Sequence, residues 1–180
     1  VRATQILAFE AQVALAVELG VPVNVHSRNA ERQTLEILRR TKVQGVMHAF
    51  KGEPALAVEA AKSGRLLFSF PPSLVYKREY QDAVRALPVE SLLLETDSPS
   101  LAAGGPKERN EPGFIGLAAA KMAELKGLAK AEVAELTTQN ALRLFRRSAS
   151  SLSDALAGQS SSRSLRSVKP ARWKKAPEGY

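Results

Sequence analysis

The stretch Gly-Val-Pro-Val-Asn-Val-His, residues 20–26, decides the fold class of this 180-residue chain. Ile6, Phe9, Val13 and Val17 precede it at helical spacing, whereas residues 21–25, a short apolar stretch with three β-branched valines, are too few for a helix. We therefore predict a helix followed by a strand. The alternation recurs, with strands predicted over 45–47, 66–70 and 92–94 and helices over 32–40, 54–62, 79–86, 114–126 and 130–145. Alternating helices and continuously apolar strands are typical of a parallel α/β sheet.

The number of strands limits the architecture. Four parallel strands within residues 1–147 make half of a closed (β/α)₈ barrel, which typically needs about 250 residues. The structural alternative is an open, doubly wound domain. The sequence has neither the G-x-G-x-x-G nor the G-x-x-x-x-G-K-[ST] pattern, which argues against a nucleotide-binding fold of that kind.

The composition changes near Arg147. Residues 148–180 are rich in Ser, Arg and Lys, and we predict that they form a disordered basic tail after a folded domain over 1–147. The formal net charge of +8 is divided about equally between these two parts. Such a tail can bind nucleic acid or act as an import signal, but a solvated terminus is the favoured interpretation.

The chain has no cysteine, which excludes disulfides, Cys-ligated zinc, a thiolate nucleophile and an Fe–S cluster. Any metal must therefore bind to His and carboxylates. No apolar run of about 18 residues is present and no secretory signal opens the chain, so we expect no membrane insertion and an intracellular location, cytoplasmic or nuclear. The start at Val1 suggests a piece of a longer chain.

Three polar residues stand at or just after predicted strand ends. His26 and His48, the chain's two histidines, end two of the strands, and Asp97 follows a third. The carboxyl ends of parallel strands converge, so we expect these side chains on one face. Two imidazoles and a carboxylate form a ligand set suited to Zn²⁺, Mn²⁺ or a similar ion.

At this point the sequence resembles a known family, the TatD-type metal-dependent deoxyribonucleases of the amidohydrolase superfamily. The resemblance covers about residues 1–146, and the eukaryotic members look the most similar. It rests on five motifs in order: P-V-N-V-H-S-R (22–28), H-A-F-K-G (48–52), L-E-T-D-S-P (94–99), R-N-E-P (109–112) and T-T-Q-N-A-L-R-L-F (137–145).

This resemblance implies a TIM-like barrel that cleaves phosphodiester bonds of DNA at a centre of two divalent ions, zinc, manganese or magnesium. His26 and His48 would bind one ion. Asp97 would bind the other and act as the catalytic residue that orients or deprotonates the attacking water. Arg28 would help to bind a phosphate of the substrate, with a plain surface charge as the alternative. Glu95 would contact the substrate or support a ligand.

The sequence also departs from the family. The His-x-His pair of the family's first strand and its bridging glutamate from a middle strand are absent here. The match is therefore to the C-terminal half of the barrel, with an incomplete metal centre and weak activity of its own. Two alternatives remain open: a hydrolase of the same superfamily that acts on a small molecule, and a non-catalytic product that binds nucleic acid or a partner.

Two structural expectations follow. Half a barrel has bare edge strands and exposed inward-facing residues such as Val25, Val46, Leu67 and Leu93, so we expect self-association. We also expect Asn110 and Glu111 to serve as the N-cap and first-turn acid of the helix that follows, rather than as site residues.

Overall fold

The computed structural model of the chain describes residues 2–159, with side chains described for residues 2–145. Its centre is a parallel sheet whose four strands lie side by side in chain order. The strands are β1 (Val23–His26), β2 (Gly45–His48), β3 (Leu66–Phe70) and β4 (Leu92–Leu94). This arrangement confirms the predicted α/β fold, and β1 and β4 are the two edges of the sheet.

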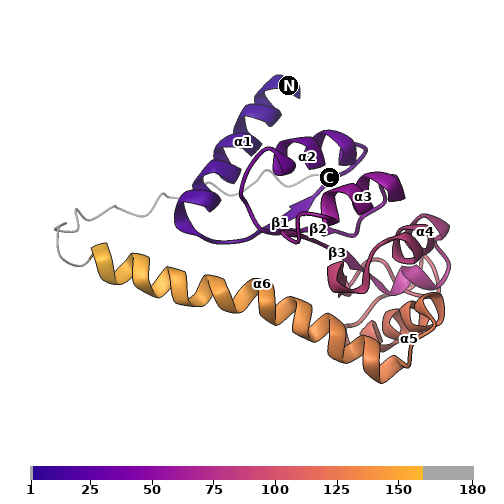
Figure 1. Ribbon diagram of the computed structural model, residues 1–180. Helices are drawn as coiled ribbons and strands as arrows, with labels where there is room; N and C mark the ends of the chain where they lie inside the picture. Colours follow the sequence, from indigo (N-terminus) through magenta and orange to yellow (C-terminus); the bar gives the residue numbers. More distant parts are fainter. Residues whose placement is uncertain (1, 160–180) are drawn as a thin grey trace, which may run out of the picture.

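Helices alternate with these strands, as the apolar spacing predicted (Figure 1). Pro54 opens the helix after β2 at a position where no intrahelical N–H is needed, and left-handed Gly127 ends the helix after β4. The helices are α1 (Arg2–Leu19), α2 (Glu31–Arg39), α3 (Pro54–Ala61), α4 (Arg78–Ala86), α5 (Ile115–Lys126) and α6 (Lys130–Gln159). Short 3₁₀ turns are η1 (Pro72–Val75), η2 (Val89–Ser91) and η3 (Pro112–Phe114).

Alternation along each strand divides the side chains between two faces of the sheet. On the helix-covered outer face, Met47, Phe68 and Leu92 are fully buried and join the main apolar core. Val25 belongs to this core, not to the inner face. The rings of Phe50 and Phe68 meet edge to face, with their centroids 5.1 Å apart. Burial of the outer face therefore anchors the sheet on its helices.

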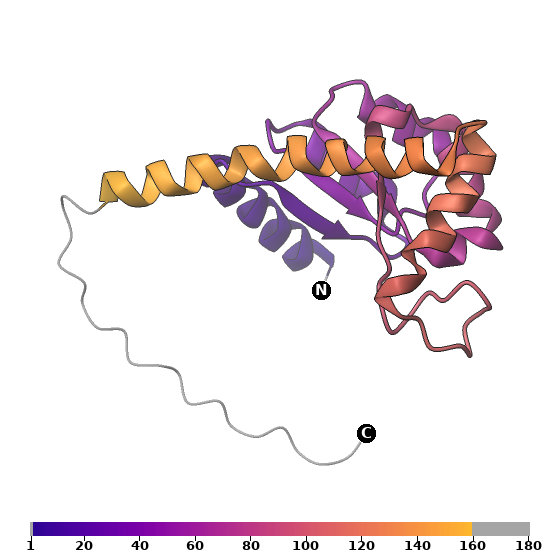
Figure 2. The same ribbon diagram turned by 90° about the horizontal axis from the view of Figure 1, so that it is seen from below.

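The inner face is covered by α6, which lies across the strands on the side opposite α1, α2 and α3 (Figures 1 and 2). Leu144 of α6 packs against Val46, Leu67 and Leu93, and each of these four side chains is at most 6% exposed. The expectation of an exposed inner face is thus wrong for these residues. The reason is tertiary: a helix remote in sequence covers the apolar part of the face.

The boundary predicted at Arg147 also changes, because α6 continues to Gln159. Ala and Leu recur through residues 148–157 with no Gly or Pro until Gly158, a composition that favours continuation of a helix. The remainder of the predicted tail, 160–180, lies outside the described residues. Within residues 2–159, no helix combines the length and the apolar character needed to cross a membrane.

Candidate functional site

The two histidines lie side by side at the carboxyl ends of the first two strands. His26 is the register partner of His48, and both are the last residue of their strands. Their ring centroids are 5.6 Å apart and the ring planes are tilted by 45°. The sequence prediction that the two imidazoles share one face is confirmed. His26 is exposed on the edge strand, whereas His48 is half-buried.

Glu95, just after β4, holds the ring of His48. One carboxylate oxygen, Oε2, lies 2.6 Å from Nδ1 of His48, and Ser69 Oγ donates to the same oxygen. The backbone N–H of Glu95 donates to the carbonyl of Phe70, so the carboxylate is fixed by continued strand pairing. Three neighbouring strands therefore supply one connected group of polar side chains.

The contact changes the acidity of His48. Its hydrogen bond to Glu95 is the main cause that raises the pKa of His48 above the ordinary value of 6.5; burial opposes the shift, and the charges of Glu95 and Asp97 support it. With Nδ1 engaged by Glu95, Nε2 is the ring nitrogen that faces outward. Glu95 thus fixes the orientation of this imidazole and favours its protonated form.

Asp97 faces that second nitrogen. Its Oδ1 lies 3.5 Å from Nε2 of His48, and its backbone has a left-handed φ of 55°. Such a φ costs a non-glycine residue roughly 1 kcal/mol, less for Asp than for most others, and must be held in place by the surrounding structure.

Asn110 supplies that support. Its side-chain amide donates to the carbonyls of Thr96 and Ser100, both at 2.6 Å, and its Oδ1 accepts from the backbone N–H of Glu111. The loop that carries Asp97 is therefore tied to a buried side chain. The N-cap prediction for Asn110 and Glu111 is wrong: η3 and α5 begin at Pro112 and Ile115, and neither has a side-chain cap.

The donors fit part of a divalent metal shell. Two ligands of one tetrahedral zinc ion lie about 3.4 Å apart, close to the 3.5 Å between His48 Nε2 and Asp97 Oδ1. Within the described part of the chain, however, no three His, Cys, Asp or Glu side chains come close enough together to hold an ion. His48 and Asp97 therefore offer two ligands for one ion, and the ring of His26 lies 5.6 Å from the ring of His48.

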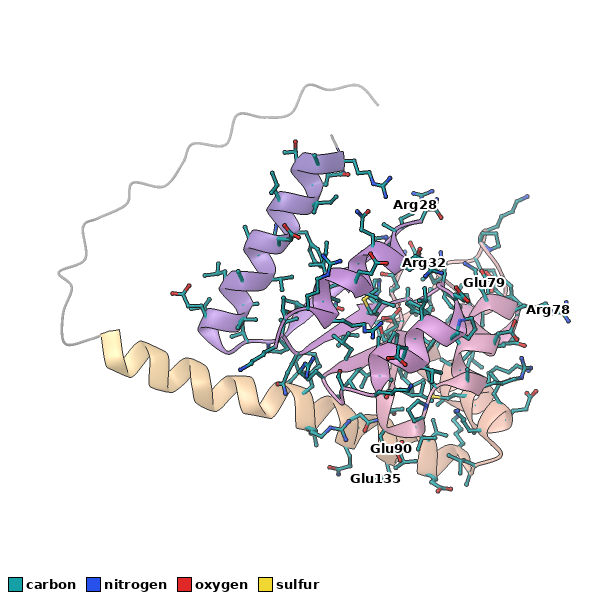
Figure 3. The ribbon with its side chains drawn as sticks, turned by 45° about the horizontal axis from the view of Figure 1, so that its top comes forward. Arg28, Arg32, Arg78, Glu79, Glu90 and Glu135 are labelled. Carbon is teal, nitrogen blue, oxygen red and sulfur yellow. The ribbon has the colours of Figure 1, made fainter. Side chains whose placement is uncertain are left out.

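Arg28 lies in the loop between β1 and α2 and is exposed. Figure 3 shows it at the same end of the domain as Arg32, Arg78 and Glu79, with Glu90 and Glu135 at the opposite end. Arg32 is paired with Glu53 at 2.9 Å. Arg28 therefore lies in the loop directly after the end of β1. Its side chain forms no hydrogen bond or ion pair with any of the residues that the structure describes.

Sequence reasoning missed two members of the site, Ser69 and Asn110. The inward alternation of β3 could have revealed Ser69, because it follows Leu67 by two residues. Five buried side-chain atoms lack a hydrogen-bond partner among residues 2–145: Ser27 Oγ, Ser73 Oγ, Tyr80 OH, Glu95 Oε1 and Ser98 Oγ. Ser27, Ser73, Glu95 and Ser98 lie within four residues of a strand end, whereas Tyr80 lies in the first turn of α4.

Comparison with known proteins gives a consistent result. The family model described as TatD related DNase matches residues 1–146. The human deoxyribonuclease TATDN3 is 46% identical over 137 residues, which cover 74% of this chain and 48% of that protein. An uncharacterized metal-dependent hydrolase of Bacillus subtilis, YabD, is 36% identical over 143 residues, 77% of this chain and 56% of that protein.

A solved structure supports the same assignment. The TatD homologue YJJV of Escherichia coli superimposes with a TM-score of 0.68 at 28% identity, covering 75% of this chain and 54% of that one. The chain therefore spans about half the length of the relatives that it matches. The match to half of a barrel and the similarity to a eukaryotic member are both confirmed.

Proposed function

This chain belongs to the family of TatD related DNases, and from that premise we propose that its strand-end cluster is one half of the active centre of a metal-dependent hydrolase that cleaves phosphodiester bonds of DNA. The observation that carries the proposal is the pair formed by His48 and Asp97. An imidazole nitrogen and a carboxylate oxygen face each other at 3.5 Å, with the other ring nitrogen held by Glu95. This combination suits metal-assisted hydrolysis.

Each residue has a distinct role in the proposal. His26, His48 and Asp97 hold divalent ions, zinc, manganese or magnesium, and Asp97 also orients the attacking water and accepts its proton. When bound, such ions lower the pKa of water and neutralise phosphate oxygens. Glu95 fixes His48 through Oε2, and its Oε1 is buried and has no hydrogen-bond partner among the described residues. Arg28 contacts a phosphate of the strand from the rim.

We propose that a second copy adds ligands to the cluster across the open edges of the sheet. β1 and β4 carry backbone groups that no strand of the described residues pairs, and such edges favour association. If two copies paired β4 of one with β1 of the other, the loop with Asp97 would lie beside the strand that ends at His26. We therefore include self-association through these edges in the proposal.

Metal binding and plasmid cleavage by the full chain test the function. Because the described residues supply few ligands, we expect weak binding of one Zn²⁺ or Mn²⁺ per chain by isothermal titration, and slow cleavage that a chelator abolishes. Asp97→Asn should remove both the metal binding and the cleavage. Asp82→Asn, which changes an exposed carboxylate on α4 that is paired with Arg85, should leave both unchanged.

The alternatives give different results in the same assays. Chelator-sensitive hydrolysis of esters or amides without cleavage of DNA would favour a small-molecule hydrolase. Binding of DNA that weakens steeply with salt, without any hydrolysis, would favour a non-catalytic binding role. Wild-type cleavage by Asp97→Asn with saturating metal would show that the assigned role of Asp97 is wrong.

A further inference from the structure

Two lysines that the proposed site does not use share one aromatic ring. Lys51 lies in the loop after β2, and Lys77 stands directly before α4. Their Nζ atoms lie 6.0 Å and 5.4 Å from the centroid of the Tyr80 ring. Two separate loops at the carboxyl edge of the sheet therefore bring two ammonium groups to the same side chain.

Both ammonium groups lack an anionic partner. None of the ion pairs or hydrogen bonds formed among residues 2–145 involves the side chain of Lys51 or Lys77. Burial is the main cause that lowers the pKa of Lys77, the charge of Lys51 lowers it further, and nearby Glu79 acts in the opposite sense. Lys77 is partly buried and Lys51 is exposed, and the repulsion between their like charges is relieved when an anion binds to both.

Tyr80 connects these lysines to the candidate site. Its side chain is fully buried, its ring meets Phe70 edge to face, and its hydroxyl has no hydrogen-bond partner among the described residues. Burial raises the pKa of Tyr80, and the charges of Glu95, Glu79 and Asp97 raise it further, which places the phenol within their field. Lys51 follows His48 by three residues, and Lys77 and Tyr80 follow β3, which is next to β4 and the segment with Glu95 and Asp97, so these residues lie at the same edge of the sheet.

The start of α4 adds to the positive potential there. Lys77 occupies the N-cap position and makes no side-chain cap, so the first-turn N–H groups remain without a capping side chain. Figure 3 shows Arg78 and Glu79, the first residues of α4, at the same end of the domain as Arg28. A phosphate group suits the two ammonium groups and the first-turn N–H groups of α4, because its negative charge is shared by several oxygens that each accept hydrogen bonds.

We infer that Lys51, Lys77 and the start of α4 form a phosphate-binding subsite beside the His48–Asp97 pair. The inference rests on the proposed function, because it assigns the phosphate to the phosphodiester backbone of the substrate. Lys51 and Lys77 are binding residues here. They hold a strand phosphate next to the site of cleavage and offset the negative charge of Glu95 and Asp97.

Phosphate binding to the metal-free full chain tests this subsite without any measurement of cleavage. Inorganic phosphate is titrated into wild type and into the double variant Lys51→Gln/Lys77→Gln. A matched double variant, Lys42→Gln/Lys62→Gln, removes the same charge near the opposite ends of the strands. We expect at least about tenfold weaker binding for the first variant and less than about twofold for the second, with melting temperatures close to wild type.

Several results would overturn the inference: no phosphate binding by wild type, equal binding by the Lys51/Lys77 variant, or an equal loss in the Lys42/Lys62 control. If the first variant does not fold, ¹⁵N titration of the Lys77 side chain in wild type decides. Phosphate should raise its pKa, and an unchanged pKa at saturating phosphate would contradict the subsite.

Competition then identifies the source of the phosphate. A short oligonucleotide without terminal phosphates should displace inorganic phosphate, which assigns the subsite to a backbone phosphodiester. Displacement only by a 5′-phosphorylated oligonucleotide assigns it to a terminal phosphate, and displacement by neither counts against a nucleic-acid phosphate. Because the assay needs no metal and no hydrolysis, its failure is separate from any failure of the proposed function.

Discussion

Leu144→Ala tests the covering of the inner face by α6, the feature that the sequence did not predict. Leu144 is 5% exposed and packs on Val46, Leu67 and Leu93. Shortening its isobutyl side chain to methyl removes three carbons and costs about 2.4 kcal/mol in transfer free energy, at roughly 0.8 kcal/mol for each carbon. A cavity term brings the expected loss of unfolding free energy to about 3 kcal/mol.

Urea denaturation followed by circular dichroism measures this loss. For a folded part of this size, about 3 kcal/mol lowers the melting temperature by roughly 6–12 °C. The matched control is Leu7→Ala on α1, where the same side chain is 67% exposed, and its cost should be within about 0.5 kcal/mol. If Leu144→Ala lowered the unfolding free energy by less than about 1 kcal/mol, as little as the Leu7→Ala control, α6 would not cover the sheet in solution.

Three further predictions concern the site and its supports. In metal-free protein, Glu95→Gln should lower the pKa of His48 toward 6.5 in an NMR titration, and an unchanged pKa would contradict the contact. Because the native pKa of His48 is raised, the loss of unfolding free energy in this variant should be greatest below pH 6.5 and should shrink as the pH rises through the native pKa. Asn110→Ala leaves the part-buried carbonyls of Thr96 and Ser100 without their donor, so we expect a loss of about 1–3 kcal/mol and faster amide exchange in residues 96–101; unchanged exchange would argue against its role. Gly45→Ala should destabilise the sheet by about 1–3 kcal/mol in chemical denaturation, because the new Cβ would lie 2.6 Å from the carbonyl oxygen of Val23, and a neutral result would mean that the start of β2 can shift freely.

The local pattern of the sequence determined most of the secondary structure and the placement of the candidate site residues at one edge of the sheet. Alternating apolar segments located the four strands, and the motifs around His26, His48 and Asp97 marked one edge of a parallel sheet. These features depend on side-chain periodicity and on the shared direction of the strands. Both are properties of short segments, which is why sequence reasoning could find them.

Tertiary packing alone decided the remaining features. Leu144 lies on strands that are 50 or more residues away in sequence, Asn110 holds the Asp97 loop instead of capping a helix, and Tyr80 gathers lysines from two loops. Apart from the local contact of Lys77 with Tyr80, these contacts join segments whose spacing in the sequence carries no periodic signal. The free energy of burial and of hydrogen bonding selects such partners only once the sheet has brought the segments together.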